Sequence, residues 1–339
     1  MDSVVVGVYH YGGGTATVDP PMIDRRRLPA ATLKPEVAAY LDEFFGVVQP
    51  AALDRDLLDW TQLRSDATAL AGDATSPADV HDVLNLTLRR IDHHSYLQPP
   101  ADHADWSTGV DGTDEVDPDL AYATGRIVEE RMAYLTVPGI SSGHDKTLRA
   151  YADSLQQLIA RLDQPGVDEW IIDLRQNTGG NCWAMLAGIG PLLGQGVCGY
   201  FMDRDTAGAN AWWYWKGGSY LDRDLRLQLT DPYQLQRGVR VAVLYGPETA
   251  SSGEVVAIAF RNMAGTRSFG QPTSGYSTGN RTYYLSDGAA VLLTVSVYGD
   301  RDKNAYGGPV PPDETVAPAR GTDAAAEAAA TWLRSQRQR

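Results

Sequence analysis

The sequence predicts an α/β protein with a largely parallel sheet, preceded by a segment of helices. Apolar residues recur at helical spacing up to about residue 92, and strand-like and helical segments alternate after about residue 132. Such an alternation is typical of a parallel sheet covered by helices. With 339 residues, of which 43% are hydrophobic, the chain can bury one large core or two moderate ones.

The first part of the chain is expected to form an arm and a helical subdomain. Residues 1–31 show no helical period and are assigned to the arm, whereas residues 32–105 are assigned to the helices. The first helix begins at about Pro35 and places five apolar side chains on one face: Val37, Leu41, Phe44, Phe45 and Val48. A second helix is predicted over residues 53–71.

A third helix is predicted to begin at Ser76, whose side chain can cap the free amides, while Asp79 lies near the positive end of the helix dipole. The pattern ends at Asp92 after five apolar residues: Val80, Val83, Leu84, Leu88 and Ile91. Two histidines, His93 and His94, follow directly.

Residues 101–120 are rich in Asp, Gly and Thr and predict a loop, and residues 120–339 are expected to form the α/β domain. Its predicted strands cover residues 132–137, 170–174, 239–245 and 291–297. Its predicted helices cover residues 145–162, 182–193, 252–263 and 323–339. The aromatic stretch 211–215 is interpreted either as part of a packed hairpin or as the wall of a binding site.

Composition narrows the possible partners. The formal net charge of -14 repels both phosphate backbones and anionic lipids, so we expect neither nucleic acid nor a membrane as a partner. Cys182 and Cys198 lack metal-ligand spacing and are expected to be reduced, buried thiols. No signal peptide and no membrane-spanning stretch is recognisable, which favours a cytoplasmic setting.

Two turns carry the chemical signal. Residues 173–181 form a strand end with the adjacent glycines Gly179 and Gly180, which let backbone amides point outward at the start of a helix. Such a turn suits an oxyanion, although a Gly-Gly turn can also be structural. In residues 249–254 a buried strand leads to Ser251, either a simple helix N-cap or an exposed nucleophile beside the next amide.

Together and in this order, the two segments resemble the S41 peptidases, the tail-specific or C-terminal processing proteases. That family has an Asp-x-Arg-x-Asn-x-Gly-Gly strand end and a Ser-x-x-Glu turn, which is matched here by Ser251 and Glu254. Residues 269–275 resemble its Gly-x-x-Thr-x-Gly loop, and the match continues through residues 285–288 and 312–313. The resemblance covers about residues 75–318.

The resemblance implies a serine-type hydrolase with a ClpP/crotonase-like α/β core. Ser251 would be the nucleophile, and the backbone amides of Gly180 and Ser252 would hold the oxyanion. Neither a metal nor an organic cofactor is implied.

The expected catalytic base departs from the Ser/Lys pattern of the family. Members with a Ser/Lys dyad place the lysine where this chain has Tyr276, and a phenol with a pKa of about 10 is a poor base at neutral pH. The tricorn branch of the family instead uses a histidine in a His-Ser-Tyr context, which matches His94. His93 falls where tricorn has a serine that helps to hold the base. The alternative is two surface histidines that close a helix.

A carboxylate should fix the tautomer of His94, but no acid aligns with the family's glutamate. Asp300 and Asp302 are candidates by neighbourhood, and each can instead be a solvated turn residue. If His94 is unperturbed, activity should fall as the pH drops through about 6.5.

Substrate recognition also departs from the family. Tail-specific proteases carry an inserted PDZ domain, for which the stretch between Ser95 and Met132 is too short. We therefore expect a short peptide or peptide-like substrate that is hydrolysed through an acyl-enzyme. Two alternatives stay open: ring- or ester-forming acyl transfer, and a non-catalytic peptide-binding protein on the same scaffold. No oligomeric state is predicted.

Overall fold

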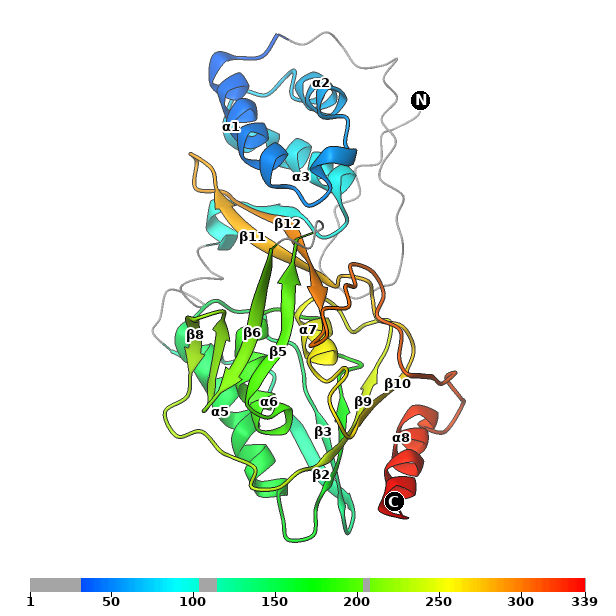
Figure 1. The fold of residues 1–339 in the computed structure, drawn as a ribbon. Helices are drawn as coiled ribbons and strands as arrows, with labels where there is room; N and C mark the ends of the chain where they lie inside the picture. Colours follow the sequence, from blue (N-terminus) through cyan, green and yellow to red (C-terminus); the bar gives the residue numbers. More distant parts are fainter. Residues whose placement is uncertain (1–31, 104–114, 204–207, 339) are drawn as a thin grey trace.

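The computed structural model describes residues 32–103, 115–203 and 208–338. Helices lie at one end of the molecule, and two sheets with further helices make up the larger body (Figure 1). The predicted arm at residues 1–31 and part of the predicted loop at residues 101–120 lie outside the described residues.

The helical end consists of three helices: α1 (Pro35–Ala51), α2 (Trp60–Leu70) and α3 (His81–Ile91). The expected face of α1 is buried, as predicted. The second helix is shorter than predicted, because Asp59 caps α2 by accepting a hydrogen bond from the amide of Gln62. Short 3-10 helices at Arg55–Leu57 and Pro77–Val80 precede α2 and α3.

The predicted parallel sheet is present in the larger body. Its strand order is β13 (Glu314–Thr315), β10 (Thr266–Gly270), β9 (Arg240–Tyr245), β4 (Glu169–Asp173), β3 (Met132–Thr136) and β2 (Thr124–Glu129). All neighbours in it are parallel except β2 and β3. Helices cover both faces, which explains why β4 is buried along its whole length.

Alternate side chains of the parallel strands enter two different cores. Trp170 and Val241 pack in the large core with three helices, α5 (Asp145–Leu162), α6 (Cys182–Leu193) and α7 (Ser252–Ala259). Ile171 and Ala242 point to the other face, against α8 (Ala324–Ser335). The bounds of α5 and α6 agree with the prediction, whereas α7 ends earlier, since Asn262 adopts a left-handed φ of 56°.

A second, antiparallel sheet was not expected. Its order is β1 (Tyr96–Gln98), β12 (Ala290–Gly299), β5 (Gly196–Met202), β6 (Ala209–Trp215), β7 (Gly218–Leu221) and β8 (Asp224–Gln228), and β11 (Thr278–Tyr284) also pairs with β12.

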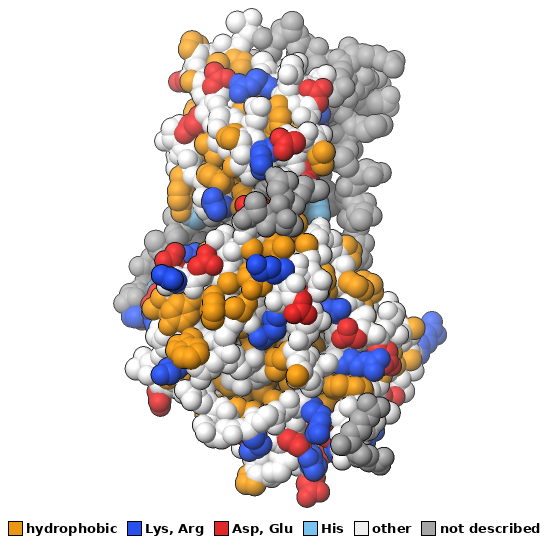
Figure 2. Space-filling view, in the orientation of Figure 1, with side chains coloured by type: hydrophobic (Ala, Val, Ile, Leu, Met, Phe, Trp, Pro, Cys, Tyr) orange, Lys and Arg blue, Asp and Glu red, His pale blue; other side chains and the backbone are white. Residues whose placement is uncertain are grey.

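The aromatic stretch 211–215 is part of the hairpin strand β6. Trp212 and Tyr214 are buried, while Trp213 and Trp215 stay exposed. Figure 2 shows hydrophobic side chains on this face, over β6 and β8. Throughout the described ranges, every helix is too short or too polar to cross a membrane.

β12 joins the helical end to the body. Leu97, Val291 and Leu293 belong to the same core as the three helices, and β1 pairs with β12 immediately after the histidines. Tyr96, two residues after the predicted base, is therefore already paired with the sheet.

Candidate active site

The two turns predicted to carry the chemistry lie side by side. β4 and β9 are parallel neighbours, with Asp173 paired to Leu244, so the turns that follow them start from the same edge of the sheet. The amide of Ala250 donates to the carbonyl of Asn177 at 3.0 Å, and the hydroxyl of Ser252 donates to the carbonyl of Gly180 at 2.7 Å.

Glycine is required at this junction. Gly180 has a φ of 115°, and a Cβ there would lie 1.9 Å from the carbonyl oxygen of Ile140. A Cβ on Gly179 would approach Ala250 and the Cβ of Ser251 at 2.8 and 3.0 Å. Among the hydrogen bonds described for the resolved ranges, none uses the amides of Gly180 and Ser252 as donors. These amides can therefore receive a developing negative charge.

Ser251 occupies a strained position between β9 and α7. Its backbone has φ 50° and ψ -115°, which L-residues rarely adopt and which is common where strain serves a function. Its amide donates to Glu254 Oε2 at 2.7 Å, and its side chain forms a hydrogen bond with Tyr298. Burial raises the pKa of Tyr298 well above its usual value, so this hydroxyl stays protonated.

The helical end positions His94. Asp92 ends α3 and accepts hydrogen bonds from the amides of His94 and Ser95 at 2.8 and 2.6 Å. Its carboxylate also accepts from the hydroxyl of Thr294 on β12 at 2.9 Å. The side-chain amide of Asn280 on β11 donates to the carbonyl of His94 at 3.0 Å. Both neighbouring strands thus fix the backbone of this histidine.

The imidazole of His94 contacts a hydroxyl rather than a carboxylate. Nδ1 lies 2.7 Å from Thr278 Oγ1 at the start of β11, and the side chain is buried. Burial, followed by the nearby charge of His93, lowers the pKa of His94 to about 3. A neutral His94 is therefore favoured at neutral pH, and the condition for an acid limb near pH 6.5, an unperturbed His94, is not met.

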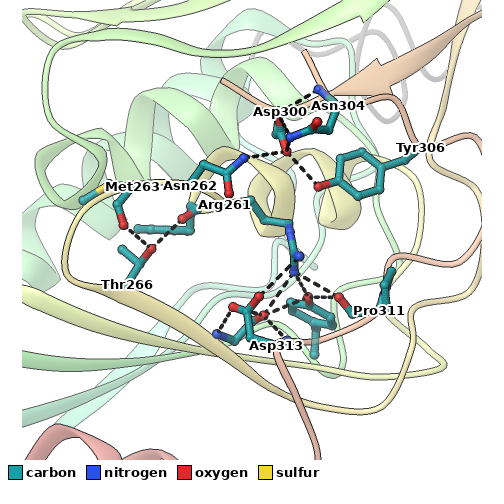
Figure 3. Close-up of polar contacts among 12 residues, drawn as sticks. Arg261, Asn262, Met263, Thr266, Asp300, Asn304, Tyr306, Pro311 and Asp313 are labelled. Carbon is teal, nitrogen blue, oxygen red and sulfur yellow. Dashed lines mark hydrogen bonds and ion pairs between the residues drawn. The ribbon is translucent and has the colours of Figure 1, made fainter. Parts of the chain in front are cut away.

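The two acids expected beside His94 lie elsewhere. Asp300 is buried and accepts hydrogen bonds from the side chains of Asn304 and Tyr306 in its own turn region and of Asn262 after α7 (Figure 3). Asp302 is exposed. The expectation that one of them holds His94 is corrected, because Thr278 occupies the Nδ1 side of the ring.

His93 and Tyr276 lie next to the base. Nε2 of His93 is 3.0 Å from the carbonyl oxygen of Gly275. The Tyr276 ring lies 4.9 Å from the His93 ring and 5.0 Å from the His94 ring, between centroids. Tyr276 thus packs against both imidazoles from the position that a lysine holds in the Ser/Lys members.

A cavity of about 430 Å³ opens beside the base, between the helical end and β12. His94, Thr278, Asp92 and Tyr306 line it together with apolar side chains such as Val297. Within the described ranges, no cluster of three His, Cys, Asp or Glu side chains is arranged to hold a metal ion.

The sequence reasoning missed Thr278, Tyr298 and the buried carboxylate of Glu254. Glu254 was noted only as part of the Ser-x-x-Glu pattern. Thr278 stands two residues after Tyr276 in a segment that was already singled out, which was the available signal for it. Tyr298 follows the predicted strand 291–297, and its contact with Ser251 depends on the tertiary fold.

The parallel sheet and the paired turns define a serine-type hydrolase. Residues 131–316, more than half of the chain, match the profile of Peptidase family S41, and the chain belongs to this family. The predicted fold class is thereby confirmed.

Relatives agree with this assignment. A nisin-resistance protein from Lactococcus lactis subsp. lactis is 29% identical over 210 residues, which span 62% of this chain and 62% of that protein. A lipoprotein from Streptococcus agalactiae superimposes with a TM-score of 0.70 and 23% identity, covering 90% of this chain and 98% of its own. A photosystem II D1 C-terminal processing protease superimposes with a TM-score of 0.54 and 17% identity, and the match covers 87% of this chain and 99% of that protease. The two structures show that the fold is shared.

Proposed function

We propose that this protein is a serine peptidase that cleaves a short peptide through an acyl-enzyme, with Ser251 as nucleophile and His94 as base. The observation that carries the proposal is the pairing of the two turns. It sets a strained serine next to the amides of Gly180 and Ser252, which no described hydrogen bond uses.

In the proposed mechanism, Thr278 accepts a hydrogen bond from Nδ1–H of His94, which leaves the lone pair on Nε2. Nε2 takes the proton from the Ser251 hydroxyl as the oxygen attacks the peptide carbonyl. The amides of Gly180 and Ser252 stabilise the oxyanion. His94 then protonates the leaving amine, and water releases the acyl group by the same steps.

The first experiment replaces Ser251. Ser251→Ala should abolish turnover without unfolding the protein, and a fluorophosphonate probe should label wild-type protein at Ser251. Ser252→Ala is the comparison: it keeps the amide but removes the bond from its hydroxyl to Gly180, so it should still be labelled, at a lower rate. If Ser251→Ala keeps more than about a tenth of wild-type activity, the assignment of the nucleophile is wrong.

The second experiment separates the two histidines. His94→Ala should be nearly inactive at every pH, because the variant lacks the group that takes the proton from Ser251. His93→Ala should keep measurable activity, since His93 contacts the carbonyl of Gly275 and the ring of Tyr276 and is not the proposed base. The opposite ranking would make His93 the base, and full activity in both variants would exclude a Ser/His mechanism.

The substrate is proposed from the relatives and the cavity. Because one relative is a nisin-resistance protein, nisin is the first peptide to offer. Product masses would distinguish hydrolysis, which adds water to the fragments, from ring- or ester-forming transfer, which does not. Folded protein that neither reacts with the probe nor cleaves peptides would instead favour a peptide-binding role. Recognition of protein tails is not proposed, because the stretch between Ser95 and Met132 is too short for a PDZ domain.

The cytoplasmic setting also stays a prediction. One structural neighbour is described as a lipoprotein, so the same fold occurs outside that setting. Fractionation of the producing cells, with an antibody against this chain, would test the prediction. Recovery of the protein outside the cytoplasmic fraction would contradict it.

A further inference from the structure

Glu254 is fully buried in the first turn of α7, and its two carboxylate oxygens contact two separate segments. Oε2 accepts a hydrogen bond from the amide of Ser251 at 2.7 Å. Oε1 accepts from the hydroxyl of Thr273 at 2.5 Å and from the amide of Gly275 at 3.1 Å. The amide of Tyr276 donates as well.

The second of these segments is the loop that faces the histidines. The carbonyl of Gly275 contacts His93, and the ring of Tyr276 packs on both imidazoles. A continuous line of contacts therefore runs from the backbone of the nucleophile, through Glu254, to the base. A second hydrogen bond links this loop to the nucleophile turn, because the amide of Ser274 donates to the carbonyl of Thr249 at 2.9 Å.

We propose that Glu254 is a positioning residue whose carboxylate, in its ionised form, fixes the nucleophile turn to the loop facing His93 and His94. This inference rests on the proposed function of Ser251. A non-glycine residue at positive φ is strained and persists only when its surroundings hold it. The bond from its amide to Glu254 is such a restraint, and the same carboxylate determines where the loop lies relative to it.

The surroundings of Glu254 match a carboxylate better than a carboxylic acid. Three of its four partners are backbone N–H groups, which cannot accept a proton, and the Thr273 oxygen already accepts from the amide of Val310. Tyr298 is the nearby titratable group that interacts with the charge, and within the described ranges no Lys or Arg forms an ion pair with Glu254. Protonation would therefore break at least one of these bonds.

Burial raises the pKa of Glu254 to about 7, against the lowering effect of the hydrogen bonds from Thr273 and the three amides. Activity should consequently fall as the pH drops through about 7, while His94 stays neutral. The contribution of Glu254 to the stability of the fold has the opposite pH dependence. Because the folded-state pKa is raised, the contribution of this group to stability is present below its ordinary pKa and lost as the pH rises through about 7.

The test compares kcat and KM between pH 5 and 9 for wild type and two variants. Glu254→Gln should lose about 10- to 100-fold in kcat and show no acid limb, because the side chain no longer titrates. Thr273→Val keeps Glu254 but removes a donor that favours the carboxylate, so the acid limb should move up by about 0.5 to 1 pH unit. Glu248→Gln, on the exposed part of the same turn, is the control and should match wild type.

Two results would overturn the inference: an acid limb that persists in Glu254→Gln, or a limb that does not move in Thr273→Val. If Glu254→Gln fails to fold, the shift of the acid limb in Thr273→Val still tests the role of Glu254. Ser251→Ala, run in the same assay, keeps the two proposals apart. An active Ser251→Ala contradicts the proposed function, whereas an inactive one combined with an unchanged limb contradicts only the role of Glu254.

Discussion

His94 is a buried, neutral imidazole, and at the scale of single residues the contact of its Nδ1 with Thr278 distinguishes its two ring nitrogens. Thr278 Oγ1 lies 2.7 Å from Nδ1, where triads normally have a carboxylate, and in the proposed mechanism it accepts from Nδ1–H. A hydroxyl can accept from Nδ1–H as a carboxylate does, but it can also donate, and it adds no negative charge to stabilise the imidazolium. The low pKa of His94 is consistent with that missing charge.

This arrangement predicts that Thr278→Val lowers kcat by about 10- to 100-fold, which corresponds to the loss of an orienting hydrogen bond of about 1–3 kcal/mol. Valine keeps the shape of the side chain, so KM and stability should change little. Thr282→Val, on the exposed face of the same strand, is the control. A variant of Thr278 with unchanged kcat would show that the ring is oriented by its packing alone.

The sequence could indicate Ser251 and Gly180 because each lies in a continuous motif whose local chemistry is readable. The partner of His94 could not be found in this way, since Thr278 is 184 residues away along the chain. Asp300 was chosen for its charge and its position near the end of a strand. Its carboxylate instead stabilises its own turn, which is the ordinary role of such an aspartate.

At the scale of elements, the site is made by two strand ends and the helices that leave them. Their turns touch so closely that a side chain is excluded at the contact, where Gly179 meets Ala250 and Ser251. Parallel strands buried on both faces give continuous apolar runs, so β4 and β9 were visible in the sequence. β8 exposes most of its side chains and shows no alternation, so it was not predicted, although the strand at residues 291–297 and a hairpin at residues 211–215 of the same antiparallel sheet were.

The close approach of Ile140 to Gly180 predicts that Gly180→Ala lowers kcat by at least about 100-fold, because an added Cβ would displace an oxyanion donor. Kinetics with a short peptide, together with circular dichroism to confirm folding, would measure this effect. Gly46→Ala in α1 is the matched control, since nothing lies within 4 Å of its Cβ. That substitution should leave kcat unchanged and stabilise the protein by about 0.5–1 kcal/mol. Equal activity of the two variants would contradict the assignment of the turn.

At the scale of the whole molecule, the nucleophile and the base belong to different parts of the chain, and their alignment depends on the joint between these parts. The turn between β11 and β12 enters the helical end. There Asp287 accepts a hydrogen bond from the hydroxyl of Tyr40 at 2.8 Å and lies 2.7 Å from Nε2 of His81. Together with the pairing of β1 and β12, this contact holds the helices on the sheet that also carries Thr278.

The contact of Asp287 with the helical end predicts that Asp287→Ala destabilises the protein by about 1–2 kcal/mol and lowers kcat more than it raises KM. Burial raises the pKa of Asp287, but hydrogen bonds from Ala289, Tyr40 and His81 outweigh it and hold the pKa below its usual value. The stability from this carboxylate is therefore present at neutral pH and lost as the pH falls through its lowered pKa. Urea unfolding at pH 7 and pH 3 should show a large difference between wild type and variant at pH 7 and a smaller one at pH 3. Asp302→Ala, on an exposed turn, should behave as wild type at both values. A difference that is equal at the two pH values would show that Asp287 acts through packing and not through its charge.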